Sequence, residues 1–353
     1  MSIKLHPFPS FLHPPFGASL SALPVTRDGV RLVPEGDLVA TESPAFAELR
    51  IRSNPSQANS RGICGLLPAS AFLDGTVRPH EKTLLARLGR QENTVLADGG
   101  ALGKPVLLTV PSLQSFWQAM DREYASSKER AIFNGQNNDY ELRPYQSSAN
   151  GGANMVDLEL PAPLVIADGH HRAETHARLS AAGETSCDFV PVCIIGADEL
   201  TIGAFTRVIT DMRAPSALLP ELGFFFEHER IAGPEAPTKP GEWLLVCKDA
   251  CYRLTRKPDG DQSIDSEWLD HTVLPRVFSI TDTRADERIG FEPTPDPHGG
   301  TLEFPHKTGK VYLCGFPLPV DTFFAEVEAG HLLPPKSTRF EPRVPSGLVV
   351  WRP

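Results

Sequence analysis

Short apolar runs bounded by turn residues recur along the chain from residue 61 onward. Their length and nearly continuous apolar character predict buried strands at Gly62–Leu67, Pro105–Val110, Leu164–Ala167 and Phe189–Ile195. Between these runs, leucines at 84, 85 and 88 and apolar residues at 113, 117, 120 and 124 recur every three or four positions. That spacing predicts amphipathic helices over 83–90 and 112–128. Strands that alternate with helices indicate a mixed α+β fold.

The distribution of proline and glycine divides the chain into three predicted parts. Residues 1–60 are rich in proline and polar residues, which excludes a long helix and indicates a segment that wraps around the rest. Residues 61–213 hold the apolar runs and form the predicted core. From Pro215 the composition changes, and strands at 243–247 and 311–314 with a helix at 319–329 predict an additional C-terminal α+β subdomain over 214–353. We expect the polar stretch 134–154 to be a mobile surface loop.

Charge and composition narrow the class of protein. The chain has 34 basic and 44 acidic residues, a formal charge of -10, which opposes the basic field used for sequence-independent nucleic-acid binding. The amino terminus lacks the apolar stretch of a secretory signal, and no apolar run reaches the roughly 18 residues of a membrane span. We therefore expect a cytoplasmic protein with neither a nucleic-acid nor a membrane partner. The six cysteines lie in apolar segments, which favours reduced thiols over a disulfide framework.

The strongest candidate for chemistry is the pentapeptide Asp168-Gly169-His170-His171-Arg172. It lies between an apolar run and a helix-like segment, so the order strand, tight turn, helix is predicted. Three side chains that can be cationic then sit where the first helical turn leaves free N–H groups, a favourable place for phosphate. The alternative is that the histidines merely cap the helix or hold a neighbouring loop.

A second polar cluster, His80-Glu81-Lys82-Thr83, precedes the helix that is predicted to begin near Leu84. Glu81 is the best candidate for a general base, because a carboxylate beside histidine and lysine at a loop-to-helix junction can be kept ionised and aimed into a cleft. The alternative is a solvated helix start, where charged residues are common.

Two further clusters are weaker. Prolines bracket Lys336, Ser337 and Thr338 within 334–342, which fixes an extended loop rich in donors that can close over an anion, or else a stiff surface tail. The alternating charges of 282–289 are typical of a solvated face.

Together these segments, with the strand Thr206-Arg207-Val208-Ile209, resemble a large bacterial and archaeal family known as domain-of-unknown-function family 1015. The resemblance covers about residues 61 to 353, and its Asp-Gly-His-His-Arg and Pro-Pro-Lys-Ser-Thr motifs are distinctive in combination. The chain departs from the family pattern at Ala173 and Arg339, where aromatic residues are common.

That family in turn resembles the ParB/sulfiredoxin fold, which includes a free-serine kinase, sulfiredoxin and the CTP-binding protein ParB. The resemblance implies that Gly169, His170, His171 and Arg172 hold nucleotide phosphates, while Asp168 orients the turn or helps to hold magnesium. It further implies that Glu81 and His80 are catalytic residues, with Glu81 deprotonating a hydroxyl group. Accessory roles are expected for Lys82, Thr83, Arg207, Lys336, Ser337 and Thr338.

The leading hypothesis is a phosphotransferase that uses ATP or ADP with Mg²⁺ to modify a small polar hydroxyl compound, free serine being the acceptor suggested by analogy. The alternative is a nucleotide-binding or nucleotide-hydrolysing regulator of the ParB type, without a small-molecule acceptor. A metal hydrolase using Asp168, His170, His171 and His176 ranks lower, because the histidines lack the i, i+4 spacing of helical ligands. A sulfiredoxin-like reductase is rejected, since no cysteine lies between Pro161 and Arg178.

Overall fold

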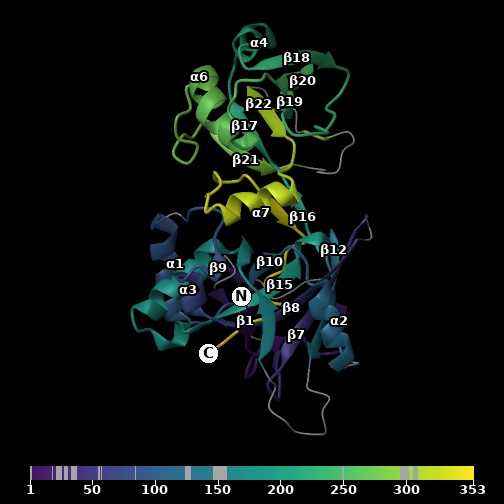
Figure 1. Ribbon diagram of the computed structural model, residues 1–353, viewed down its shortest axis with the longest axis vertical. Coiled ribbons are helices and arrows are strands. Elements are labelled where there is room, and N and C mark those ends of the chain that lie inside the picture. Colours follow the sequence, from purple (N-terminus) through teal and green to yellow (C-terminus); the bar gives the residue numbers. More distant parts are fainter. Residues whose placement is uncertain are drawn as a thin grey trace. The chain divides into compact units, whose positions relative to one another are not determined.

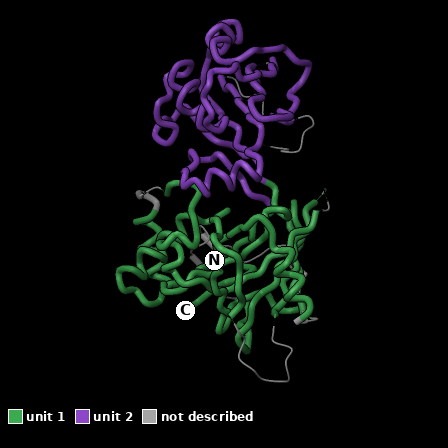
Figure 2. The backbone as a smooth tube through the Cα atoms, viewed as in Figure 1, with its two compact units in different colours: residues 1–201, 342–353 green, residues 202–341 purple. Residues whose placement is uncertain are grey.

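The computed structural model describes residues 2–353 except for 18, 21–25, 28–30, 33–37, 55, 57, 84, 124–128, 146–156, 249, 295–301 and 305–308. The chain forms two compact units (Figure 2). Unit 1 contains residues 1–201 and 342–353, and unit 2 contains residues 202–341. The chain thus leaves unit 1 once and returns to it for its last twelve residues.

A mixed sheet of nine described strands organises unit 1 (Figure 1). In spatial order the strands are β3 (Ser19–Leu20), β11 (Ala131–Asn134), β12 (Asn138–Tyr145), β7 (Phe46–Ser53), β8 (Asn59–Pro68), β15 (Phe189–Gly196), β10 (Val106–Val110), β14 (Leu164–Asp168) and β9 (Val77–Arg78). The pairs β10–β15, β14–β9 and β11–β3 are parallel, and the other neighbours are antiparallel. Every residue of β10 is buried, as expected for a central strand covered on both faces.

Three helices and three two-stranded sheets accompany the large sheet among the described residues of unit 1. The helices are α1 (Leu85–Ala97), α2 (Gln114–Glu123) and α3 (His170–Ala181), with short 3-10 turns η1 (Ala69–Phe72), η2 (Thr185–Cys187) and η3 (Ala197–Glu199). Two-stranded sheets pair β1 (Ser2–Leu5) with β13 (Leu158–Pro161), β2 (Leu12–His13) with β6 (Val39–Ala40), and β4 (Thr26–Arg27) with β5 (Arg31–Leu32). Helix α1 packs on α3, and α3 also contacts β10 and β15 (Figure 1). The turn that enters α3 is therefore held against the centre of the sheet.

Unit 2 is built on an antiparallel sheet of six described strands. Its order is β18 (Phe226–Ile231), β20 (Ala250–Arg256), β19 (Glu242–Cys247), β22 (Lys310–Gly315), β17 (Phe205–Thr210) and β21 (Ile289–Pro293). The helices are α4 (Pro215–Leu222), α5 (Asp265–Trp268), the π-helical turn η4 (Leu269–Val273), α6 (Leu274–Phe278) and α7 (Val320–Glu328). The short strands β16 (Thr201–Gly203) and β23 (Arg339–Glu341) pair with each other. One large apolar core joins α4, α5, η4 and α6 to one face of the six-stranded sheet.

The mixed α+β class is confirmed, and the predicted strands around residues 62–67, 105–110, 164–167 and 189–195 are present. The loop predicted over 134–154 is wrong for residues 138–145, which form β12, while 146–154 lie outside the described residues. The boundaries of the compact units differ from those predicted at 60 and 213, because β7 pairs with β8 inside the large sheet and residues 342–353 return to unit 1.

None of the described helices is long and apolar enough to span a membrane.

Candidate functional site

The predicted strand, turn and helix are present at the pentapeptide. Strand β14 ends at Asp168, Gly169 has φ 103° and ψ 25°, and α3 begins at His170. This backbone conformation favours glycine, and a Cβ atom added at Gly169 would lie 2.6 Å from Nη2 of Arg172. Glycine therefore lets the Arg172 guanidinium fold back over the turn that precedes its own helix.

Three described cations surround the Asp168 carboxylate. Oδ2 of Asp168 lies 2.9 Å from Nζ of Lys104 and 3.2 Å from Nη2 of Arg172, and Oδ1 lies 3.6 Å from Nη1 of Arg343. Arg172 also donates to the Pro105 carbonyl over 3.3 Å, and its buried Nε has no partner among the described residues. We call Asp168, Lys104, Arg172 and Arg343 the Asp168 centre.

The Asp168 centre has more positive than negative charge. Burial alone would raise the pKa of Asp168, but Arg172, Lys104 and Arg343 outweigh burial and hold that pKa well below its ordinary value. Burial lowers the pKa of Lys104, and the neighbouring arginines lower it further, although Asp168 acts in the opposite direction. Within this group of four side chains, three cations face one carboxylate. Such a surplus at the start of a helix favours an anion.

Burial favours the neutral forms of two histidines at the site, His80 and His170. His80 is buried, its Nδ1 donates to the Ile166 carbonyl over 2.6 Å, and burial lowers its pKa to about 4. Its ring meets that of His170 edge-on, with centroids 4.4 Å apart. The pKa of His170 is lowered well below its ordinary value, first by burial and then by His80.

Backbone contacts assign the His170 tautomer. Nε2 of His170 accepts a hydrogen bond of 3.4 Å from the backbone N–H of His80, so a neutral His170 carries its proton on Nδ1. Burial beside a second imidazole disfavours the charged form that the sequence allowed for His170. Lys104 and Arg343, which the motif did not include, supply positive charge instead.

The structure brings the 80–83 cluster next to the pentapeptide. His80 contacts His170, and the Thr83 hydroxyl donates to Glu174 of α3. Glu81 is partly exposed and Lys82 is exposed. Glu81 therefore lies on a segment anchored to α3 at both of its ends, with solvent access that His80 lacks.

The remaining predicted residues belong to unit 2. Arg207 is buried and donates to Oδ1 of Asp270 from Nη2 and Nε, at 3.1 and 3.2 Å. Ser337 accepts from Ser266 over 3.0 Å, and Thr338 beside it is buried. Arg207 and Ser337 line a cavity of about 220 Å³ within this unit.

Lys336 is exposed, and its ammonium lies 5.0 Å from the ring centroid of Phe205, which lines the same cavity. These accessory candidates thus form a cluster of their own inside unit 2.

Asp168 does not fit the role of a magnesium ligand. Both of its oxygens face cations, whereas Mg²⁺ is held by carboxylates free to coordinate it. Among the described residues, no group of three or more His, Cys, Asp or Glu side chains is arranged to hold a metal ion. In the set considered for a metal hydrolase, Nε2 of His176 lies 3.0 Å from the Gly100 carbonyl. Of the two roles expected for Asp168, the geometry supports the orienting one.

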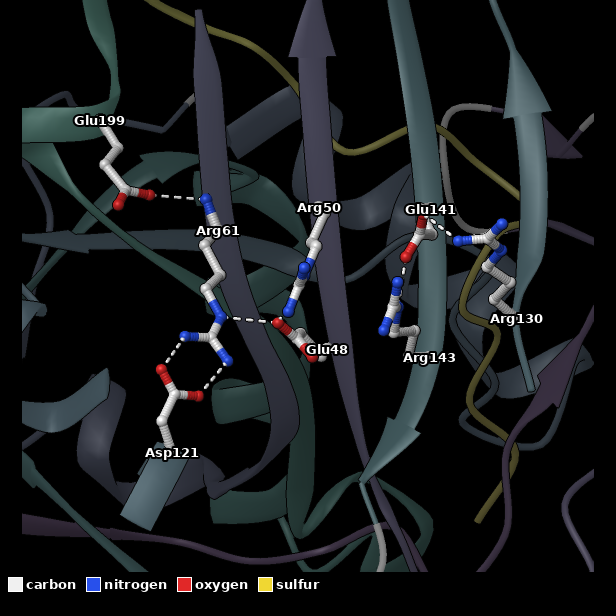
Figure 3. A network of polar contacts seen from close by, with 8 residues as sticks. All are labelled: Glu48, Arg50, Arg61, Asp121, Arg130, Glu141, Arg143 and Glu199. Carbon is white, nitrogen blue, oxygen red and sulfur yellow. Dashed lines mark hydrogen bonds and ion pairs between the residues drawn. The ribbon is translucent and has the colours of Figure 1, made fainter. Parts of the chain in front are cut away.

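A second polar cluster of unit 1 is charge-balanced (Figure 3). The Arg61 guanidinium donates to both Asp121 oxygens at 2.7 and 2.9 Å and to Glu48 at 2.6 Å. Arg50 also donates to Glu48, and the backbone N–H of Arg61 donates to Glu199. We call the eight residues drawn the Arg61 network: Glu48, Arg50, Arg61, Asp121, Arg130, Glu141, Arg143 and Glu199.

The sequence motif did not include Lys104 and Arg343, the two further cations at Asp168. Lys104 immediately precedes the predicted strand 105–110, and Arg343 immediately follows the proline-bracketed segment that ends at 342. Their proximity to Asp168 cannot be inferred from these positions alone. It follows from the pairing of β10 with β14 and from the return of the C-terminal segment to unit 1.

Comparison with known proteins identifies the family. The family model described as "Protein of unknown function (DUF1015)" matches residues 30–277, well over half of the chain. The chain therefore belongs to this family, as the sequence motifs predicted. No curated protein matches it.

Several solved structures are distantly similar. SbnI with a C-terminal truncation from Staphylococcus aureus matches with TM-score 0.45 and 17% identity, covering 79% of this chain and 84% of that one. A mutant free serine kinase in complex with ADP matches with TM-score 0.41 and 13% identity, covering 80% and 91%. A conserved hypothetical protein from Pyrococcus furiosus matches with TM-score 0.39 and 13% identity, covering 80% and 93%. At these values the likeness says nothing of activity, which has to follow from the residues of this chain.

Proposed function

We propose that the protein is a nucleotide-dependent phosphotransferase that binds the phosphate chain of ATP or ADP at the Asp168 centre and modifies a small hydroxyl compound. The observation that carries the proposal is the surplus of cations at the first turn of α3. Phosphoryl transfer depends chiefly on positioned positive charge around the phosphates. The backbone N–H groups at the start of α3 and the Nδ1–H of His170 add donors to that charge.

Asp168 is the positioning residue of this arrangement. Its carboxylate holds the Lys104 ammonium and the Arg172 guanidinium at the turn, so that both cations are in place before an anion arrives. His80 acts in the same way, because it is buried, hydrogen-bonded to the Ile166 carbonyl and edge-on to His170. We therefore assign His80 to positioning rather than to proton transfer.

Glu81 is the proposed general base. In the transfer, the acceptor oxygen forms a bond to the terminal phosphorus, the bond from phosphorus to the bridging oxygen breaks, and the hydroxyl proton passes to the Glu81 carboxylate. A magnesium ion bound to the nucleotide would neutralise phosphate charge. The partial exposure of Glu81 is compatible with access to a substrate.

The more detailed expectations are part of this proposal. They are the ParB/sulfiredoxin type of fold, a cytoplasmic location, free serine as the acceptor, and a functional division of the chain at residues 60 and 213. The nearest alternative is a nucleotide-binding regulator that uses the same phosphate site and has no acceptor.

Phosphorus NMR tests the proposal. The purified protein is incubated with Mg²⁺, ATP or ADP, and a pool of hydroxyl amino acids and small polyols. We expect a new phosphomonoester signal that disappears in Arg172→Ala and persists in Arg178→Ala. Arg178 is the matched control because it lies on the same helix, pairs with Glu92 and Glu174, and is about half exposed.

Phosphate release without a phosphorylated acceptor would favour the regulator. The absence of both nucleotide turnover and nucleotide binding would overturn the phosphate site itself.

A further inference from the structure

The three cations of the Asp168 centre are not held equally. The side chains of Arg172 and Lys104 are 9% and 15% exposed and lie 3.2 and 2.9 Å from Asp168. Arg343 is 39% exposed, and its contact is the longest at 3.6 Å. Arg343 is therefore the cation that solvent, and hence a dissolved anion, reaches most readily.

The backbone that carries Arg343 is firmly anchored in unit 1. We call residues 342–353 the C-terminal strap. Leu12 and Val350 exchange two backbone hydrogen bonds of 2.9 Å, and Leu102 and Trp351 exchange two more of the same length. Gly347 N–H donates to the carbonyl of Gly103 over 2.8 Å, one residue before Lys104.

The Arg343 carbonyl itself accepts from the Tyr140 hydroxyl over 3.1 Å. The strap thus fixes the backbone at Arg343, while 39% of the Arg343 side chain stays exposed.

Release of Arg343 from Asp168 leaves the carboxylate paired. Lys104 and Arg172 both contact Oδ2, and the Arg172 guanidinium is confined by Gly169 and the Pro105 carbonyl. The long Arg343 contact is the one whose loss changes the centre least. A guanidinium that exchanges a carboxylate for a phosphate keeps a charged partner and gains a bidentate one.

We infer that Arg343 is a specificity-determining residue that leaves Asp168 and binds the terminal phosphate of a polyphosphate chain, while the turn at Gly169–Arg172 binds the preceding phosphate. This inference rests on the proposed function and extends it. It assigns the ligand class of the site as diphosphates and triphosphates in preference to monophosphates, and it makes the C-terminal strap part of that site.

Isothermal titration calorimetry with four probes tests the inference: inorganic phosphate, inorganic pyrophosphate, AMP and ADP. Loss of one charge-assisted contact predicts that Arg343→Gln weakens pyrophosphate and ADP by about 10- to 100-fold. We expect its affinity for phosphate and AMP to stay within about twofold of the parent. Arg343→Lys should recover part of the lost affinity, because lysine keeps the positive charge but lacks the planar guanidinium that binds an anion through two N–H groups.

Arg352→Gln is the matched control, since Arg352 is an exposed arginine of the same strap. It should bind all four probes like the parent protein, with an unchanged melting temperature.

Two results would overturn the inference and leave the proposed function standing. One is an unchanged pyrophosphate and ADP affinity in Arg343→Gln. The other is an equal loss for all four probes together with a lowered melting temperature, which identifies Arg343 as a structural ion-pair partner only. If the parent protein binds none of the probes, the proposed function fails and the inference fails with it.

Discussion

The Asp168 centre and the Arg61 network are both clusters of charged residues in unit 1, but their charges are balanced differently. The centre has three cations around one carboxylate. The network has four arginines and four carboxylates, joined pairwise across β7, β8, β12, α2 and neighbouring loops (Figure 3). Arginine content alone does not distinguish them.

The comparison teaches that burial alone does not distinguish the two clusters, whereas the ratio of cations to carboxylates among their members does. Glu48 in the network is fully buried, yet two arginines satisfy one of its oxygens, and the Arg61 guanidinium stacks 3.8 Å from the ring centroid of Trp117. The Arg61 network contains as many carboxylates as arginines, and its ion pairs link neighbouring elements of unit 1. In the centre, three cations share one carboxylate, and the proposed phosphate site rests on this arrangement.

Arg61→Gln should have the largest effect and should act on stability alone. It leaves the buried Glu48 with one cation fewer and breaks the bidentate pair with Asp121, so we expect a loss of about 3–5 kcal/mol in the free energy of unfolding. Urea denaturation measures it. Pyrophosphate affinity should stay within twofold under folding conditions, and a selective loss of that affinity would contradict the separation of the two clusters.

Acid should lower the stability of the folded protein through protonation of His80. The folded pKa of about 4 lies below the ordinary 6.5, so as the pH falls through this range the unfolded chain binds a proton that the folded one rejects. We expect a loss of about 3 kcal/mol from this group between pH 6.5 and 4, with full stability above 6.5. His80→Asn keeps a donor for Ile166 and should flatten that part of the pH profile in urea denaturation.

An equally steep acid loss in His80→Asn would show that other groups cause it.

Gly169→Ala should separate backbone strain from phosphate binding. Positive φ costs a non-glycine residue about 1–2 kcal/mol, and here the added Cβ also displaces the Arg172 guanidinium. Gly183→Ala is the matched control, since Gly183 follows the same helix at φ 95° with nothing within 4 Å of an added Cβ. Both variants should lose similar stability in thermal unfolding, and only Gly169→Ala should lose pyrophosphate affinity. Equal binding by both would argue against Arg172 as a ligand.

Arg130→Gln should have the smallest effect. Arg130 is an outer member of the network, about half exposed and 3.3 Å from Glu141, and exposed ion pairs contribute under about 1 kcal/mol. Chemical denaturation in low and high salt checks this value. A loss as large as that of Arg61→Gln would mean that the network behaves as one cooperative unit.

Local patterns predicted the elements but not the charge of the site. Apolar runs and glycine placed β14, the turn at Gly169 and α3, because each depends on a few adjacent residues. The neutral state of His170 depends on His80, ninety residues away in the chain, and the positive charge depends on Lys104 and Arg343. These contacts between distant residues depend on the order of strands in the sheet and on the return of the C-terminal segment to unit 1. Neither can be read from a single sequence.

The same limit applies to the other predicted clusters. The motif around Lys336 was grouped with the phosphate site because it is rich in donors, whereas its described contacts are with Phe205, Ser266 and neighbouring residues of unit 2. Arg207 likewise has a partner of its own in Asp270. A polar motif indicates chemistry, but only the fold shows which opposite charge it faces.

Insertion of residues 202–341 between the two segments of unit 1 imposes an order on biosynthesis. The ribosome makes β1 to β15 first, then all 140 residues of unit 2, counted from 202 to 341, and only then the strand partners of Leu12 and Leu102 at Val350 and Trp351. At about 5–20 residues per second, some 7 to 28 seconds separate the end of the first segment from the start of the second. Arg343 is therefore synthesised only after every residue of unit 2, and the Asp168 centre cannot be complete before then.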